Sequence, residues 1–109
     1  MHELSITRNI VGIVAEKAGE RKVKAVQLTV GKLSGVEVKA IQFCFGVCAQ
    51  GTVVEGAELQ ITEPEGLARC QGCDKEFPIE HPVARCPCER KARMDIVSGQ
   101  ELLIASMET

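Results

Sequence analysis

Four of the chain's six cysteines lie in two close pairs whose spacing is typical of a metal site. Cys70 and Cys73 form a Cys-x-x-Cys pair, and Cys86 and Cys88 form a tighter Cys-x-Cys pair after a hairpin-length spacer. Two such pairs can supply four thiolates to one tetrahedral ion. Zinc suits four soft thiolates without redox chemistry, and a site closed by four protein ligands leaves no position for a substrate. The spacing therefore predicts a structural Zn(II) site.

Two details of this cysteine cluster leave alternatives open. Pro87 separates the second pair and donates no N–H to the thiolates, which leaves open whether Cys88 ligates normally or with strain; the nearby His81 is the less favoured alternative ligand. Iron in a rubredoxin-like site uses the same four thiolates, although the scarcity of aromatic residues argues against it. Zinc binds small cysteine-rich peptides with on the order of 10–16 kcal/mol, so we expect the ion to decide whether this segment folds.

The second candidate site is the N-terminal tripeptide of Met1, His2 and Glu3. His2 is too bulky for the usual removal of the initiator methionine, so we expect the mature chain to begin at Met1. The α-amine, the His2 amide nitrogen and the His2 imidazole are then close enough to chelate one ion, with Glu3 as a further donor. Several nitrogen donors in a plane suit Ni(II) or Cu(II). On these residues alone, a metal site is the less common explanation. A histidine in second position is usually an ordinary histidine, and Glu3 favours the positive end of a helix whether or not a metal binds.

The remaining cysteines, Cys44 and Cys48, are four residues apart on a predicted helix. That spacing can present two sulfurs to a metal, but buried free cysteine is common in protein cores. We therefore expect both side chains to belong to the core.

Hydrophobic periodicity predicts the elements that must position these residues. Apolar side chains recur at helical spacing over residues 3–18, and Gly19 can end that helix. Residues 23–30 alternate between apolar and polar, which predicts a strand with one buried face. Further strands are expected at residues 57–61 and 102–107.

A second helix is predicted over residues 36–49, after a turn in which Ser34 can cap it. Apolar residues occupy more than one side of this helix. We expect its apolar face to comprise Val36, Ala40, Phe43 and Val47, with Ile41, Cys44 and Cys48 as the adjoining row.

Residues 65–98 differ in character from the rest of the chain. They hold four of the six cysteines and many charges, and their hydrophobic periodicity is lost except near Phe77. We predict an α+β fold in which two helices cover a small mixed three-stranded sheet, with an inserted zinc-ribbon module. The expected domains are residues 1–64 with 99–109 and, between them, residues 65–98.

Composition excludes several classes of function. The net charge of −2 and the 3% of aromatic residues argue against a nucleic-acid partner. The N-terminus lacks the pattern of a signal peptide, and apolar stretches stay well short of the roughly 20 residues that span a bilayer. We therefore expect a cytoplasmic protein without membrane contact, in which cysteines are seldom paired as disulfides. No combination of nucleophile, base and orienting group indicates an enzyme.

The chain resembles the HypA/HybF family of hydrogenase nickel-incorporation proteins along its whole length. The resemblance rests on the opening sequence MHELS, on the four ribbon cysteines, and on matches at residues 31–36 (GKLSGV), 43–45 (FCF), 55–56 (EG) and 99–102 (GQEL). The family usually has Cys-Pro-x-Cys as its second pair, where this chain has one residue fewer.

The resemblance implies a metallochaperone with no enzymatic activity. It implies that Met1, His2 and Glu3 bind nickel, that the four ribbon cysteines bind zinc, and that nickel is passed to the [NiFe]-hydrogenase large subunit with the accessory GTPase HypB. A related family member can serve urease. The sequence leaves the oligomeric state open, a homodimer included. Two competing hypotheses are a zinc-ribbon adaptor without nickel transfer and a rubredoxin-like electron carrier.

Overall fold

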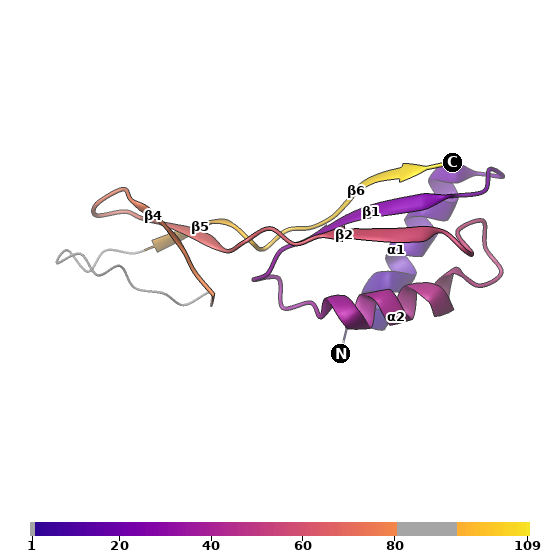
Figure 1. Ribbon diagram of the computed structural model, residues 1–109, viewed down its shortest axis with the longest axis horizontal. Coiled ribbons are helices and arrows are strands. Elements are labelled where there is room, and N and C mark those ends of the chain that lie inside the picture. Colours follow the sequence, from indigo (N-terminus) through magenta and orange to yellow (C-terminus); the bar gives the residue numbers. More distant parts are fainter. Residues whose placement is uncertain (1, 81–93) are drawn as a thin grey trace.

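The computed structural model describes residues 2–80 and 94–109, which form two helices and two small sheets (Figure 1). No helix in this described part of the chain is long and apolar enough to cross a membrane. In chain order the elements are α1 (Glu3–Ala18), β1 (Ala25–Val30), α2 (Val38–Ala49), β2 (Glu58–Thr62), β3 (Leu67–Cys70), β4 (Glu76–Pro78), β5 (Met94–Ser98) and β6 (Leu102–Glu108).

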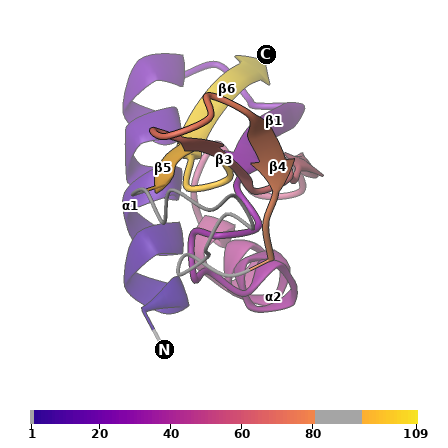
Figure 2. The same ribbon diagram turned by 90° about the vertical axis from the view of Figure 1, so that its left-hand side faces the viewer.

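The larger sheet has the strand order β2-β1-β6 and is mixed. β1 pairs in parallel with β2 and antiparallel with β6. A parallel pair needs a crossover connection, and α2 provides it between β1 and β2. The two helices pack on each other and cover one face of this sheet (Figure 2). The predicted α+β architecture of two helices on a small mixed three-stranded sheet is confirmed.

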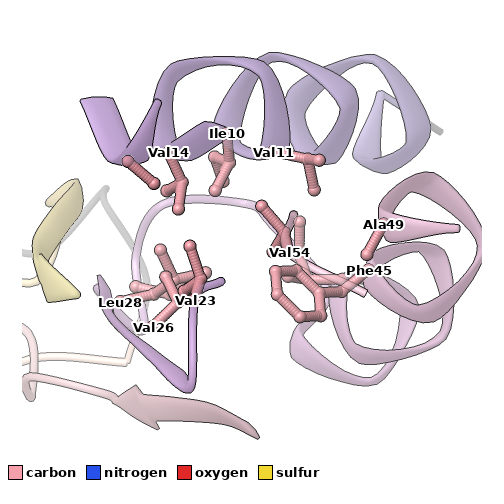
Figure 3. Close-up of a cluster of buried hydrophobic side chains, with 12 residues drawn as sticks. Ile10, Val11, Val14, Val23, Val26, Leu28, Phe45, Ala49 and Val54 are labelled. Carbon is pink, nitrogen blue, oxygen red and sulfur yellow. The ribbon is translucent and has the colours of Figure 1, made fainter. Parts of the chain in front are cut away.

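The core between the sheet and the helices is almost wholly aliphatic. β1 contributes Val26, Leu28 and Val30, each at most 1% exposed, because alternate residues of a strand point to the same face. The helices cover these β1 side chains with further apolar side chains (Figure 3). Phe45 is the one aromatic residue among the described core residues. The predicted burial of these three β1 side chains is therefore correct.

α1 follows its predicted range. Its buried residues, which include Val11 and Val14, recur every three or four positions and face the sheet. Thr7 is buried in the same row and donates its hydroxyl to the carbonyl of Glu3 at 2.6 Å, so its burial leaves no unpaired hydroxyl. Gly19 ends the helix with φ +66°, a conformation that suits glycine.

The predicted start of α2 was wrong. The helix begins at Val38, and the carboxylate of Glu37 accepts a hydrogen bond from the Lys39 N–H at 3.4 Å at its N-cap. The hydroxyl of Ser34 accepts from the Val36 N–H at 3.2 Å, which stabilises the preceding turn rather than the helix.

The predicted apolar face of α2 was also wrong. Its fully buried side chains are Ile41, Phe45 and Ala49, whereas Phe43 is 75% exposed and Val47 is 50% exposed. The helix is apolar on most of its sides, so its periodicity could not identify the side that faces the core. The direction in which α2 crosses α1 and the sheet decides this.

The smaller sheet has the order β4-β3-β5, with both pairings antiparallel. Phe77, near which the local apolar pattern persists, lies in β4 and pairs with Ala68 of β3. The strands β3 and β5 were not predicted, because few of their side chains are buried and periodicity is therefore weak. Among the described residues of these three strands, only Ala68 and Cys70 are fully buried.

Close backbone packing joins the two sheets. A Cβ added to Gly31 would overlap the carbonyl of Gly99, and a Cβ on Gly99 would lie 2.6 Å from the Cα of Gly66. Gly99 also has φ +105°, which side chains rarely adopt. The turn after β1 and the two segments that connect the sheets therefore approach each other to distances that only glycine allows.

Hydrogen bonds reinforce this junction. The backbone N–H of Lys32 donates to the Pro64 carbonyl at 3.0 Å, and that of Leu33 donates to the Gly99 carbonyl at 2.6 Å. The Lys32 ammonium contacts the Glu65 carboxylate at 2.7 Å, and this hydrogen-bonded charge raises the pKa of Lys32. The turn after β1 is thus tied to both chain segments that connect the sheets.

Replacing Gly99 with alanine tests the importance of the junction. We expect Gly99→Ala to lower the free energy of unfolding by at least about 1–3 kcal/mol, because of its positive φ and the Cβ overlap. Gly12→Ala is the matched control, since its Cβ would meet no described atom within 4 Å beyond its own stretch of helix; in the middle of α1 it should add up to about 1 kcal/mol. Urea denaturation measures the free energy of unfolding of both variants. Equal losses of free energy in Gly99→Ala and Gly12→Ala would contradict the packing described.

Candidate metal centres

His2 lies at the N-cap of α1 with its side chain exposed. Within the described part of the chain, its side chain makes no capping hydrogen bond to the helix. The first helical hydrogen bond runs from the Ile6 N–H to the His2 carbonyl at 2.9 Å. The imidazole is therefore accessible to a ligand and is not needed to hold the helix end.

The amide nitrogens of His2 and Glu3 lie ahead of that first helical bond. The first N–H groups of a helix have no acceptor in the preceding turn, so a metal bound through them breaks no helical hydrogen bond. A chelate at this point can therefore form and dissociate while α1 stays intact. Met1, whose amine was predicted to complete the chelate, lies outside the described residues.

Glu3 connects the start of α1 to the start of α2. Its carboxylate accepts a hydrogen bond from the Glu37 N–H at 3.4 Å. The pKa of Glu3 is lowered by hydrogen bonding from the ammonium group at the chain terminus, and then by the backbone N–H groups of Glu3 and Glu37. The carboxylate therefore stays ionised at neutral pH, as a metal donor must. No pattern in the sequence indicated the contact with Glu37.

Cys70 and Cys73 lie on a tight turn between β3 and β4. Cys70, the last residue of β3, is fully buried, and Cys73 is partly buried in the turn. The Gly72 N–H points at the Cys70 sulfur at 3.4 Å, and the Asp74 N–H donates to the Cys70 carbonyl at 2.8 Å. Asp74 has φ +60°, which turns the chain back so that the Cys70 N–H reaches the Lys75 carbonyl at 3.0 Å.

This turn has the features of half a tetrathiolate site. A backbone N–H directed at sulfur favours the thiolate, which is the form that binds metal. Among residues 2–80 and 94–109, no three potential ligands from His, Cys, Asp and Glu form a cluster. The other predicted ligands, Cys86 and Cys88, and the alternative ligand His81 lie outside the described residues. Cys70 and Cys73 can therefore supply two of the four thiolates.

The expectation that both cysteines of α2 belong to the core holds for Cys48, whereas Cys44 is not among the side chains that pack against the core cluster. Both are partly buried, and Cys48 packs against the core cluster. Neither lies in a cluster of three potential ligands among the described residues.

Fold and sites together define a small α+β protein with an exposed histidine at one helix terminus and a cysteine turn on a separate sheet. Over residues 1–109 the chain matches the family described as "Hydrogenase/urease nickel incorporation, metallochaperone, hypA". The chain therefore belongs to the HypA family of nickel-incorporation metallochaperones.

Relatives agree with this assignment. The hydrogenase maturation factor HypA of Trichodesmium erythraeum is 51% identical, and the match covers 99% of this chain and 95% of that protein. HypA of Chlorobaculum tepidum is 47% identical over 97% of this chain and 96% of that protein. The resemblance stated from the sequence is confirmed.

Solved structures show the same fold. The solution structure of the nickel metallochaperone HypA from Helicobacter pylori superposes with a TM-score of 0.67 at 22% identity, covering 99% of this chain and 97% of that one. A second solution structure, described as HypA protein, gives 0.70 at 23% identity, covering 99% and 95% of the two chains. At these identities the likeness supports the architecture alone.

The backbone of Asp74 provides a test of the cysteine turn. A left-handed conformation costs about 1–2 kcal/mol for most side chains, while aspartate and glycine tolerate it. We expect Asp74→Val to speed hydrogen exchange of the Cys70 amide by roughly tenfold or more, since opening the turn frees that N–H from Lys75. Asp74→Gly should leave the exchange rate close to that of the wild type. Equal rates in all three proteins would argue against this turn geometry.

Proposed function

We propose that this chain is a cytosolic nickel carrier that binds Ni(II) through Met1, His2 and Glu3. The acceptor is the large subunit of a [NiFe]-hydrogenase, and the accessory GTPase HypB takes part in delivery. The observation that carries the proposal is the exposed His2 imidazole at the start of α1, which makes no capping hydrogen bond to the helix among the described residues, in a chain of the nickel-incorporation family.

The chemistry of the proposed chelate suits transfer rather than storage. Its donors are a terminal amine, one imidazole and backbone or carboxylate groups of two adjacent residues, and nitrogen donors of this kind suit Ni(II). Such a site lies at the surface, so a partner's ligand can enter as one donor leaves. Metal binding displaces protons from the amine and the imidazole, and acidification therefore favours release. No bond in a substrate is made or broken, which makes an enzymatic role unnecessary.

We further propose that Cys70, Cys73, Cys86 and Cys88 hold a Zn(II) ion that serves architecture alone. The buried Cys70 sulfur and its N–H contact support this assignment for the first pair. The second sheet buries few side chains, so a metal would supply stability that its core lacks. The proposed zinc domain comprises residues 65–98, and residues 1–64 and 99–109 form the nickel domain.

The central experiment measures metal in protein with a native N-terminus. We expect wild-type protein, loaded with Ni(II) and dialysed at pH 7.5, to retain one nickel per chain. His2→Ala should lower nickel affinity at least tenfold, because it removes the one aromatic nitrogen donor. Zinc content should not change. Adding a single glycine before Met1 is the matched control for the amine, since it displaces the terminal donor and retains every side chain.

The same measurements separate the competing hypotheses. A zinc-ribbon adaptor would bind zinc alone and be indifferent to changes at His2. A rubredoxin-like carrier would contain iron with thiolate charge-transfer absorption. Full nickel retention by His2→Ala would overturn the proposed chelate.

The zinc proposal has its own test. We expect Cys73→Ser to lose zinc to a chelator at a concentration that leaves the wild type loaded, with affinity lowered by at least tenfold. Cys44→Ser is the control, because that cysteine lies on α2, away from the cysteine turn. Elemental analysis after dialysis reports both variants. If the two lost zinc equally, Cys73 would not be a specific ligand.

A further inference from the structure

The outer side of α2 carries an apolar surface that the fold does not use. Phe43 is 75% exposed and Val47, one turn later, is 50% exposed. Gly46 lies between them on the same side and adds no side chain. A helix on the surface of a globular protein normally presents polar residues to water, so an exposed aromatic–aliphatic pair is a feature of interaction sites. We refer to Phe43, Gly46 and Val47 as the α2 ridge.

Packing of the core does not explain why apolar residues occupy these exposed positions. Ile41, Phe45 and Ala49 already fill the side of α2 that faces α1 and the sheet. Replacing Phe43 with a small polar residue would therefore remove no buried contact of consequence. The exposed ring is the kind of side chain that anchors protein interfaces, where aromatic residues supply much of the binding energy.

The α2 ridge lies close to the proposed nickel chelate. The start of α2 is joined to the start of α1 by the hydrogen bond from the Glu37 N–H to the Glu3 carboxylate. In both views these helix starts lie at the side of the molecule opposite β6 (Figures 1 and 2). From Glu37 to Phe43 the helix rises only about 9 Å.

We propose that the α2 ridge is the docking site for the protein that accepts the nickel. A standard interface covers about 800 Å² on each partner, which is a patch of roughly 16 Å radius. A patch of that size centred on Phe43 extends past Glu37 to the start of α1. The acceptor's own ligands are thereby brought to the ion while Phe43 holds the two proteins together. The inference rests on the proposed nickel function and identifies where its partner binds.

Charge defines the acceptor surface further. Lys39 is the single charged residue in the sequence of α2, and it is exposed one turn before Phe43. The complementary surface is therefore an apolar pocket for the phenyl ring with a carboxylate beside it. A second copy of this chain fits less well, because a twofold contact through the α2 ridge would cover both chelates and close the route for transfer.

The test compares Phe43→Ser with Leu103→Ser. Leu103, on β6, is 58% exposed and lines a pocket with Ile6 and Ile10 of α1 to which α2 contributes no residue, so its replacement removes a comparable apolar side chain away from the α2 ridge. The probe is the purified, metal-free hydrogenase large subunit. We expect Phe43→Ser to weaken its binding at least tenfold and to slow nickel transfer correspondingly, with thermal stability, nickel affinity and zinc content unchanged. Lys39→Glu should slow association, most clearly at low salt. Leu103→Ser should behave as wild type.

Binding is measured with both metal-free and nickel-loaded protein. If the proposed chelate is wrong, wild-type protein will retain no nickel at its N-terminus, yet the effect of Phe43→Ser on metal-free binding still tests the docking site. Unchanged binding by Phe43→Ser would overturn the docking proposal. So would a change of the protein's own molecular mass in solution caused by this variant, because the ridge would then join copies of the chain.

Discussion

The burial of β1 beneath both helices is the constraint on which the other features depend. Three alternate side chains of this strand are almost completely shielded from water, and they require a cover of helices on one face of the sheet. Truncating a buried side chain of this size typically costs about 2–5 kcal/mol for leucine or isoleucine to alanine, a large part of a small domain's stability. α1 and α2 share one core cluster with β1 and pack on each other. Their N-terminal ends are thereby brought to one place, where Glu3 meets Glu37.

The two candidate metal centres have opposite physical properties. The N-terminal sequence lies ahead of the first helical hydrogen bond, so binding or losing an ion there disturbs little of the fold. The turn at Cys70 and Cys73 is fixed by three backbone interactions and has a buried sulfur. Under the proposed function, the N-terminal ion would exchange and the ion held by the cysteines would add lasting stability to the small second sheet. The glycine junction connects the two sheets and keeps these roles in separate parts of one chain.

The exposed face of α2 shows how a small protein can combine folding and recognition in one helix. One side of α2 completes the core through Ile41 and Phe45, and the other presents Phe43 to water. An aromatic side chain at the surface tends to reduce solubility, and Phe43 is not part of the core cluster of the described residues. The α2 ridge lies close to the proposed chelate, and docking of the nickel acceptor there would explain why Phe43 is exposed.

Much of the architecture followed from the sequence, because local patterns have local causes. The spacing of the cysteines, the range of α1, the alternation of β1 and the similarity to the family of nickel-incorporation proteins were all available before the structure. Only the tertiary structure decided which side of α2 is buried, because a helix with apolar residues on most sides fits a core in several rotations. It also decided that Glu37 rather than Ser34 caps α2, and that Glu3 reaches Glu37, since such contacts depend on how elements distant in sequence are brought together. β3 and β5 bury too few side chains to leave a periodic pattern, and their pairing becomes evident only in three dimensions.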